Sequence, residues 1–342
     1  SYSKQKLNTY VYKKIMQNYL IKSPVLVIFY NRPDKTKNII KNLINSKKNF
    51  SKLYFRVDGP KNYLDKKKIE KVIKILKRYK HKNKNNNVVI SCEKKNLGLQ
   101  HNIIKSINYV LKKNDRVIIL EDDHIPAPTF FEFCDFMLKK YENDDKIFQI
   151  SGSCYLPNNL QNDDVYLTKF PDCVGWATWK TSWSKLLKNY NFNNIIESKL
   201  VKNYYKNINI AHWFYEYLFR EYFAKYKKGL WSTWWQLSII NENGLSVNSK
   251  KNLVSHDGLD ADSNAEHFDD RYSSKKEITN KNINIKKIKN RKTIYKKNFD
   301  KYNFDIIKKT DPIFKLTNRI YWFLNFFPRL YRLKNKTVFI KF

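Results

Sequence analysis

The sequence lacks the features of secreted, zinc-binding or membrane-spanning proteins. It has four cysteines in 342 residues (Cys92, Cys134, Cys154 and Cys173), too few and too scattered for a disulfide framework or a zinc site. No apolar run approaches the roughly 20 residues of a membrane-spanning helix, and no stretch resembles a signal peptide. We therefore expect a cytoplasmic protein with reduced thiols.

Acidic residues are also scarce. The chain has 31 Asp and Glu against 67 Lys and Arg, a formal net charge of +36, which would attract nucleic acid, an anionic membrane surface or a phosphorylated substrate. Lysine is spread along the whole chain with many Asn and Ile, the pattern of an AT-rich coding bias, so we assign only part of this charge to function. Hydrophobic residues make up 42% of the chain and aromatic residues 16%. That is enough for one large or two ordinary globular domains.

The first part of the chain alternates apolar strands with amphipathic helices. Strands are expected at 24–29, 53–57, 88–91 and 117–120, and helical spacing of apolar residues follows the first three. This alternation predicts an α/β fold, with a mostly parallel sheet flanked by helices on both faces. Ligands of such sheets bind at the carboxyl ends of the strands, at a topological switch point.

Charged and polar residues stand at these strand ends. They are Asn31 and Arg32 after the first strand, Asp58 after the second, and Glu121, Asp122 and Asp123 after the fourth. Three adjacent carboxylates repel one another, more so when buried, unless a cation compensates them. Mg²⁺ and Mn²⁺ favour such hard oxygen ligands, often one or two carboxylates plus substrate phosphates. The alternative is an acidic turn with its charges in solvent. The expected position of this turn beside Arg32 and Asp58 favours a functional site.

Several short motifs follow one another in a characteristic order between residues 23 and 270. They are Pro24-Val25-Leu26-Val27 with Asn31-Arg32, Asp58, Asn96-Leu97-Gly98-Leu99 with His101, Leu120-Glu121-Asp122-Asp123, Pro128-Thr129-Phe130-Phe131, Phe148-Gln149-Ile150-Ser151-Gly152, Gly175-Trp176-Ala177-Thr178-Trp179 and Asn252-Leu253-Val254-Ser255. In order and spacing they resemble GT-A glycosyltransferases, in particular the N-acetylglucosaminyltransferase I family and related bacterial sugar transferases. The resemblance is strongest from 94 to 183.

This resemblance implies a GT-A (Rossmann-like) fold and metal-dependent sugar transfer from a nucleotide diphosphate sugar, preferentially a UDP-sugar. It implies that Asp123 ligates Mn²⁺ or Mg²⁺ at the diphosphate, and that Glu121 and Asp122 hydrogen-bond the sugar or ribose. The remaining residues that it places near the donor are Asn31, Arg32, Asp58, Asn96, His101, Gly175 and Trp176. For His101 the competing interpretation is an ordinary polar helix face, and for Trp176 a place in the core.

The sequence departs from this family at the catalytic base. Inverting relatives carry an Asp in an aromatic motif that aligns with 231–236, where this chain has no carboxylate. The candidates for the base are then Glu216, in an extra helical stretch at 193–229, and Asp257; each is also compatible with a solvated surface position. His256, or alternatively His267, is the candidate for completing the metal site.

The resemblance also suggests a division of the chain. We expect a helical lead-in at 1–22 and a glycosyltransferase domain at 23–272, whose nucleotide-binding half ends at 125 and whose acceptor half is 126–272. A basic extension, 273–342, follows. In it we expect a linker or extended arm over 273–309.

Residues 313–333 mix aromatic side chains with Lys and Arg. This composition suits an interfacial segment on an anionic membrane, or equally a terminal helix docked on the protein. The resemblance thus favours a glycosyltransferase of hexosyl or N-acetylhexosaminyl type that transfers the sugar, with inversion, to a hydroxyl of a glycan or lipid-linked acceptor. Its expected role is surface polysaccharide or glycoconjugate synthesis, such as capsule or lipopolysaccharide. The alternatives are a protein that binds nucleic acid or an anionic membrane, for which no nucleic-acid-binding module is recognisable, and a GT-A-like domain that has lost catalysis.

Overall fold

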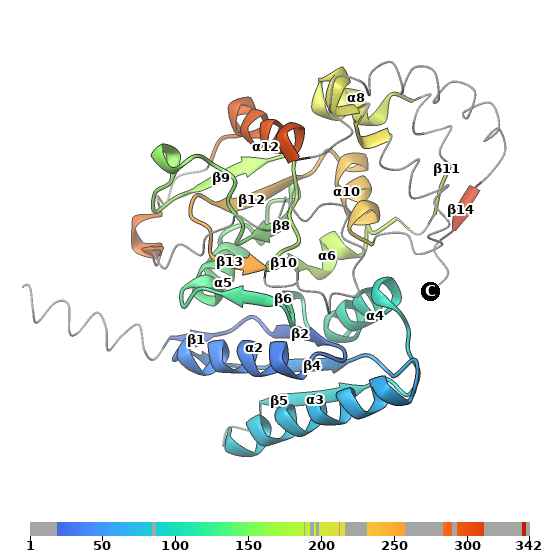
Figure 1. Cartoon of the computed structure of the whole chain (residues 1–342). Helices are drawn as coiled ribbons and strands as arrows, with labels where there is room; N and C mark the ends of the chain where they lie inside the picture. Colours follow the sequence, from blue (N-terminus) through green and yellow to red (C-terminus); the bar gives the residue numbers. More distant parts are fainter. Residues whose placement is uncertain are drawn as a thin grey trace, which may run out of the picture.

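The computed structural model has an eight-stranded central sheet flanked by helices (Figure 1). The residues that it describes are 19–83, 87–187, 189–191, 195, 198–211, 213–215, 231–256, 283–288, 293–310 and 337–339. The strand order is β5-β4-β2-β6-β10-β8-β12-β9.

Half of the sheet consists of the four strands expected from the sequence. They are β2 (Val25–Phe29), β4 (Leu53–Val57), β5 (Val88–Cys92) and β6 (Arg116–Glu121), and their pairings are all parallel. The other half consists of β10 (Trp176–Trp179), β8 (Ile147–Ser151), β12 (Leu245–Ser249) and β9 (Val165–Thr168). There β8 and β12 pair in parallel, whereas β10 and β9 run antiparallel to their neighbours. The predicted fold class, a mostly parallel α/β sheet, is confirmed.

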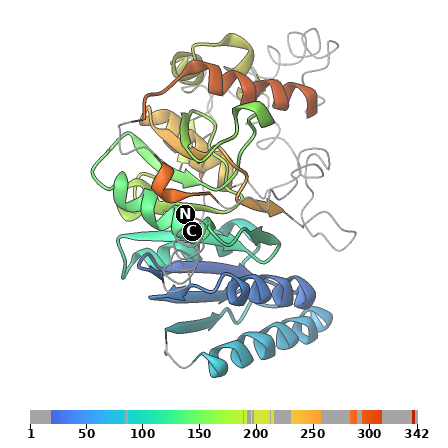
Figure 2. The same ribbon diagram turned by 90° about the vertical axis from the view of Figure 1, so that its left-hand side faces the viewer.

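Helices flank both faces because alternate residues of each buried strand point to opposite sides. On β6, Val117 and Ile119 join the core under α4 (Leu99–Leu111) and α10 (Trp231–Asn241). Their neighbours Ile118 and Leu120 join the core under α2 (Pro33–Asn45), α3 (Tyr63–Lys82) and α5 (Phe130–Lys140). Figures 1 and 2 agree in placing α3, beside the edge strand β5, at one end of the described part and α12 (Lys297–Thr310) at the other.

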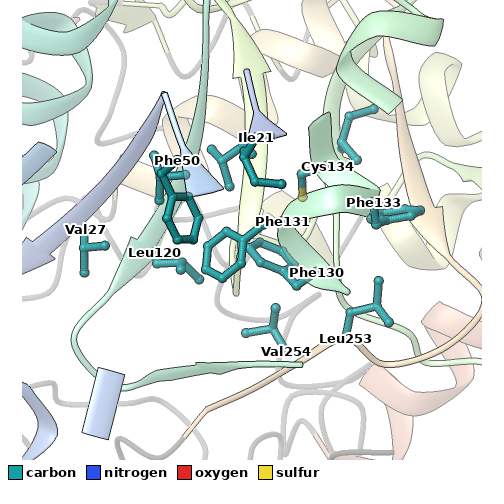
Figure 3. Close-up of a cluster of buried hydrophobic side chains, with 14 of the residues drawn as sticks. Ile21, Val27, Phe50, Leu120, Phe130, Phe131, Phe133, Cys134, Leu253 and Val254 are labelled. Carbon is teal, nitrogen blue, oxygen red and sulfur yellow. The ribbon is translucent and has the colours of Figure 1, made fainter. Parts of the chain in front are cut away.

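The core under α5 anchors the carboxyl end of β6. Figure 3 shows the rings of Phe130 and Phe131 among Phe50, Leu120 and Val254. The centroids of Phe131 and Phe50 lie 5.0 Å apart in an edge-to-face contact. The residues that follow β6 therefore continue from a closely packed strand, which fixes their position.

Short elements complete the described part of the chain. The two-stranded pairs are β1 (Leu20–Ile21) with β3 (Asn49–Phe50), β7 (His124–Pro126) with β13 (Val254–His256), and β11 (Asn189–Asn191) with β14 (Thr337–Phe339). The short helices are η1 (Asn158–Leu160), α6 (Lys180–Trp183), α8 (Leu200–Tyr205) and η2 (Ile285–Lys287). Helix α8 lies in the predicted helical insertion. Among the described residues, none of the helices has the length and apolar character required to cross a membrane.

Two expectations for the ends of the chain need correction. The lead-in at 1–22 was expected to be helical. Residues 1–18 lie outside the described residues, and Leu20–Ile21 form a strand that pairs in parallel with β3, with Ile21 buried. The arm expected over 273–309 contains the helix α12 (Lys297–Thr310). The amphipathic segment 313–333 lies outside the described residues.

Helix α12 docks on β9 through buried polar contacts. The carboxylate of Asp300 accepts hydrogen bonds from Thr168 Oγ1 (2.7 Å) and from the Lys169 backbone N–H (2.9 Å). One turn on, Asn303 Nδ2 donates to Thr168 Oγ1 at 2.8 Å, and Phe304 is buried. These contacts hold the helix on the sheet although its sequence is rich in Lys and Asn.

Candidate active site

The candidate site lies at the topological switch point of the sheet. Strand β2 lies between β4 and β6, and the chain leads from it to β4 and β5 on one side and to β6 on the other. At the carboxyl ends of β2 and β6 the sequence places Arg32 and the run Glu121-Asp122-Asp123. Arg32 Nη1 donates to Asp123 Oδ2 at 2.9 Å, and Nη2 forms an ion pair with Asp122 Oδ1. The structure thus brings together the two sets of residues that the sequence analysis selected.

This cluster is buried, and its charged groups interact strongly with one another. The side chains of Asp122, Asp123 and Arg32 are 2%, 6% and 20% exposed. Burial, together with the Asp123 charge, raises the pKa of Glu121 to about 8, and burial raises the pKa of Asp122 to about 6 against the opposing effect of Arg32. Burial alone would lower the pKa of Arg32, but Asp122 and Asp123 outweigh it and raise that pKa. Arg32 stays charged and is the principal cation of the site in the described part of the chain.

His124 is a site residue that the sequence analysis missed. The Glu121 backbone N–H donates to His124 Nδ1 at 3.1 Å, so the proton of a neutral ring is on Nε2, which lies 3.8 Å from Asp123 Oδ1. His124 begins β7 and pairs in register with His256 of β13. The backbone therefore brings His256, predicted for the metal site, opposite His124. The signal in the sequence was a histidine directly after the third carboxylate.

A second group of predicted residues meets at the ends of β4 and β5. Asp58 Oδ1 accepts hydrogen bonds from the Gly59 and Leu97 backbone N–H groups at 2.8 and 2.9 Å, and Oδ2 accepts from Asn96 Nδ2 at 3.1 Å. Burial raises the pKa of Asp58 in spite of these donors. His101 follows on the first turn of α4, where it is exposed. Asp58 thus ties β4 to the segment that begins α4.

We expect Gly59→Ala to disturb this group. A Cβ at residue 59 would overlap the Lys95 backbone, with the Lys95 nitrogen only 2.7 Å away, so the segment that brings Asn96 and Leu97 to Asp58 has to move. The free energy of unfolding should fall by about 1–3 kcal/mol, measured by urea denaturation. Gly98→Ala is the comparison, because Gly98 has φ +77 but nothing lies within 4 Å of a Cβ there. Its loss of stability reports backbone strain alone, whereas that of Gly59→Ala reports the overlap. A Gly59→Ala protein as stable as the wild type would contradict the packing.

Asn31 joins a third group, which borders the first. Its Nδ2 donates to Asp65 Oδ1 at 2.6 Å, and Tyr30 OH donates to Asp65 Oδ2 at 2.6 Å. The Tyr30 backbone N–H also donates to Asp122 Oδ2 at 3.4 Å. Asp65 was not predicted, although its place three residues after the N-cap Asn62, which accepts its N–H at 2.9 Å, marked a helix start.

The expectations for Gly175 and Trp176 need correction. Trp176 is 1% exposed and stacks on Trp231 with ring centroids 5.6 Å apart, so no face of the indole is open to a sugar. Gly175 has φ +64, and a Cβ there would overlap the side chain of Val254, whose Cβ lies 2.9 Å away. Residue 175 is therefore small so that β10 can pack against Val254, not so that a ligand can approach.

The base candidates Glu216 and Asp257 lie outside the described residues. The segment 231–236, which lacks the carboxylate expected from the resemblance, begins the helix α10, and its three tryptophans belong to the core. One described carboxylate that the sequence analysis missed is Asp172, just before β10 at the same edge of the sheet. It accepts hydrogen bonds from Tyr155 OH and, at 2.8 Å, from the Val174 N–H.

The donor set suits a hard divalent cation. In the part of the chain that the structure describes, no three His, Cys, Asp or Glu side chains are arranged to hold a metal by themselves. Asp122 and Asp123 offer carboxylate oxygens, and Mg²⁺ and Mn²⁺ commonly complete such a shell with phosphate oxygens and water. The residues therefore fit a metal that binds together with a phosphorylated substrate.

No protein-family model matches the sequence, and no curated protein matches it either. The resemblance to the N-acetylglucosaminyltransferase I family thus stays a prediction.

Solved structures similar to the chain include the mannosyltransferase PcManGT from Pyrobaculum calidifontis in complex with GDP-Man and Mn²⁺ (14% identity, 46% of this chain and 44% of that chain, TM-score 0.32). S. aureus TarS 1-349 matches at 14% identity over 47% of each chain (TM-score 0.33). Glucosyl-3-phosphoglycerate synthase from Mycobacterium tuberculosis, in complex with Mn²⁺, uridine-diphosphate and glucosyl-3-phosphoglycerate, matches at 10% identity over 52% of this chain and 66% of that chain (TM-score 0.30).

A UDP-glucose pyrophosphorylase and a 4-diphosphocytidyl-2C-methyl-D-erythritol synthase also match. The chain spans less than half the length of PcManGT and of TarS in these comparisons. The TM-scores of these five matches lie between 0.28 and 0.33.

Proposed function

We propose that the protein is a metal-dependent glycosyltransferase that moves a sugar from a nucleotide diphosphate sugar, preferentially a UDP-sugar, to a hydroxyl group of a glycan or lipid-linked acceptor with inversion. The observation that carries this proposal is the contact of Arg32 with Asp122 and Asp123 at the switch point of the sheet. An arginine fork suits a diphosphate, and the adjacent carboxylates suit its metal ion. The order of the sequence motifs supports sugar transfer in particular.

In this proposal the residues of the site have separate tasks. Arg32 orients the diphosphate, while Asp122 and Asp123, with His256 as a further candidate, hold Mn²⁺ or Mg²⁺. The bound ion supplies charge neutralisation at the departing diphosphate. Asp58 Oδ2 accepts a hydrogen bond from Asn96 Nδ2 and has capacity for a second donor. In this proposal the second donor is an N–H group of the nucleobase. Asp257, Glu216 and Asp172 are the carboxylates to test as the base for the acceptor hydroxyl.

A ligand panel tests the donor class. Thermal unfolding is followed with UDP- and GDP-sugars and free nucleotides, each with Mn²⁺ and with a chelator. A ligand present at 100 times its dissociation constant adds about 2.7 kcal/mol to the free energy of unfolding, so one nucleotide family should raise the melting temperature by several degrees only when Mn²⁺ is present. No shift with any nucleotide would count against the proposed function.

We also propose that the enzyme works as a peripheral protein on an anionic membrane, where a lipid-linked acceptor for surface polysaccharide or glycoconjugate synthesis would be presented. The support comes from α3, which we take as the docking helix. Its exposed cations are Lys66, Lys67, Lys68, Lys71, Lys74, Lys77, Arg78, Lys80 and Lys82, against a single exposed acid, Glu70. Tyr63 and Leu64, which are 67% and 70% exposed, begin the helix beside the site and suit the interfacial layer.

Charge reversal tests this docking helix. The variant Lys67→Glu/Lys71→Glu/Lys74→Glu loses three cations from one helix face, each of which contributes about 1 kcal/mol at an anionic surface, so its affinity for phosphatidylglycerol vesicles should fall about 100-fold. The matched control reverses Lys112, Lys113 and Lys180, which are exposed at the opposite edge of the sheet. Equal loss in both variants, or binding to oligonucleotides in preference to vesicles, would contradict the proposal.

A further inference from the structure

Arg32 is bound where a divalent cation would have to bind. One guanidinium nitrogen contacts Asp122 Oδ1 and the other contacts Asp123 Oδ2, so a single cation bridges the two carboxylates. The planar fork of arginine allows this bridge, which the point charge of lysine cannot reproduce. Both carboxylates are nearly inaccessible, whereas Arg32 is 20% exposed and open to solvent.

The remaining oxygen of each carboxylate faces a further neighbouring group. Asp122 Oδ2 faces the Tyr30 N–H at 3.4 Å, and Asp123 Oδ1 faces His124 Nε2 at 3.8 Å. A dication that reached either oxygen would also lie close to the guanidinium, and the repulsion between them is strong in a buried site. A metal ion alone therefore has to compete with Arg32.

A diphosphate alone meets the opposite difficulty. It enters a site where the single positive charge of Arg32 compensates only part of the negative charge of Asp122 and Asp123. When the metal and the diphosphate arrive together, the metal can take the carboxylates and the phosphate oxygens can take the guanidinium, which binds phosphate well as a fork. The diphosphate thus draws the guanidinium away from the metal, and the metal neutralises the carboxylates that repel the diphosphate.

We propose that Arg32 is the resident counter-cation of Asp122 and Asp123, and that its release to the diphosphate couples the binding of metal and nucleotide. This inference rests on the proposed function for the source of the diphosphate. By linkage, Mn²⁺ must raise the affinity for UDP by the same factor by which UDP raises the affinity for Mn²⁺.

Direct measurement of Mn²⁺ binding tests the coupling without any turnover. The free Mn²⁺ signal in electron paramagnetic resonance is titrated with protein, with and without UDP, at one pH. In the wild type, UDP should tighten Mn²⁺ binding at least about 10-fold, within the usual range of coupling. In Arg32→Gln, Mn²⁺ alone should bind about 10-fold more tightly than in the wild type. UDP should tighten Mn²⁺ binding by a smaller factor than in the wild type, because only the direct contact between metal and diphosphate remains.

Because Arg32→Gln leaves two buried carboxylates without their bridge, Arg32→Lys is measured beside it and should be intermediate in both respects. Arg116→Gln is the matched control: Arg116 lies at the other end of β6, pairs with Glu142 at 3.4 Å, and should leave both binding constants unchanged.

Three results would overturn the coupling: Mn²⁺ binding in Arg32→Gln and Arg32→Lys no tighter than in the wild type, no effect of UDP on the wild type, or no Mn²⁺ binding by any variant. The last would also remove the metal from the proposed function. Coupling as expected, but with no sugar transfer from any donor, would overturn the proposed function alone.

Discussion

Asp123→Asn is expected to lower the rate of sugar transfer by about 100- to 1,000-fold, the usual effect of removing one group that stabilises charge in a transition state. Asp123 accepts from Arg32 at 2.9 Å and is the carboxylate that the resemblance places at the metal. Asparagine has nearly the same shape and removes the negative charge of Asp123, one of the two carboxylates that Arg32 bridges. The fold should therefore persist, so the loss reports on the site and not on unfolding.

The rate is measured as release of nucleoside diphosphate from the donor in the presence of Mn²⁺, with circular dichroism as the check on folding. Asp115→Asn is the matched control, because Asp115 is exposed at the opposite end of the same strand, and it should keep the wild-type rate. An Asp123→Asn protein that retains more than about a tenth of that rate would show that Asp123 has no part in the charge stabilisation.

Trp235→Ala is expected to cause the largest loss of stability. Trp235 is fully buried in α10, and its ring centroid lies 5.1 Å from that of Trp183 and 5.9 Å from that of Trp176. Removing such a side chain lowers the free energy of unfolding by about 3–5 kcal/mol. Its Nε1 also donates to Gln149 Oε1 at 2.7 Å, so the truncation leaves a buried acceptor unsatisfied, at a further cost of about 1–3 kcal/mol.

Urea denaturation with a fluorescence or circular dichroism signal measures this loss. Trp235→Phe keeps most of the ring volume but not the donor, so it should lose less and isolate the hydrogen bond to Gln149. Trp213→Ala, at a partly buried tryptophan, should be milder. A Trp235→Ala protein within about 1 kcal/mol of the wild type, the size of an ordinary substitution, would mean that the aromatic segment is not core.

The sequence predicted those features that depend on strand periodicity. Continuous apolar runs marked β2, β4, β5 and β6, and the rule for parallel sheets then brought Arg32 to Asp122 and Asp123 without any knowledge of side-chain contacts. The ion pairs between Arg32 and the two carboxylates were not predicted. A charged residue at a strand end gives the same sequence pattern whether its side chain contacts a ligand or a neighbouring side chain.

The packing roles of Trp176 and Gly175 could not be inferred from the sequence for a similar reason. A tryptophan in the sequence is compatible both with stacking on a sugar and with packing against another indole. The position of Trp231 in the structure decides between the two. The space beside Gly175 is taken by Val254, which is 79 residues away in sequence. Helix α12 was missed because its lysines and asparagines masked the helical spacing of Asp300, Asn303 and Phe304.

The most direct test of the account is the identity of the nucleotide product. The protein is incubated with UDP- and GDP-sugars and Mn²⁺, with water and simple glycans as acceptors, and the phosphorus-containing products are identified by ³¹P nuclear magnetic resonance. The account predicts a nucleoside diphosphate, formed only with the metal and lost in Asp123→Asn. Formation of a nucleoside triphosphate and a sugar phosphate when inorganic pyrophosphate is added, or unchanged donor with every sugar in the panel, would contradict it.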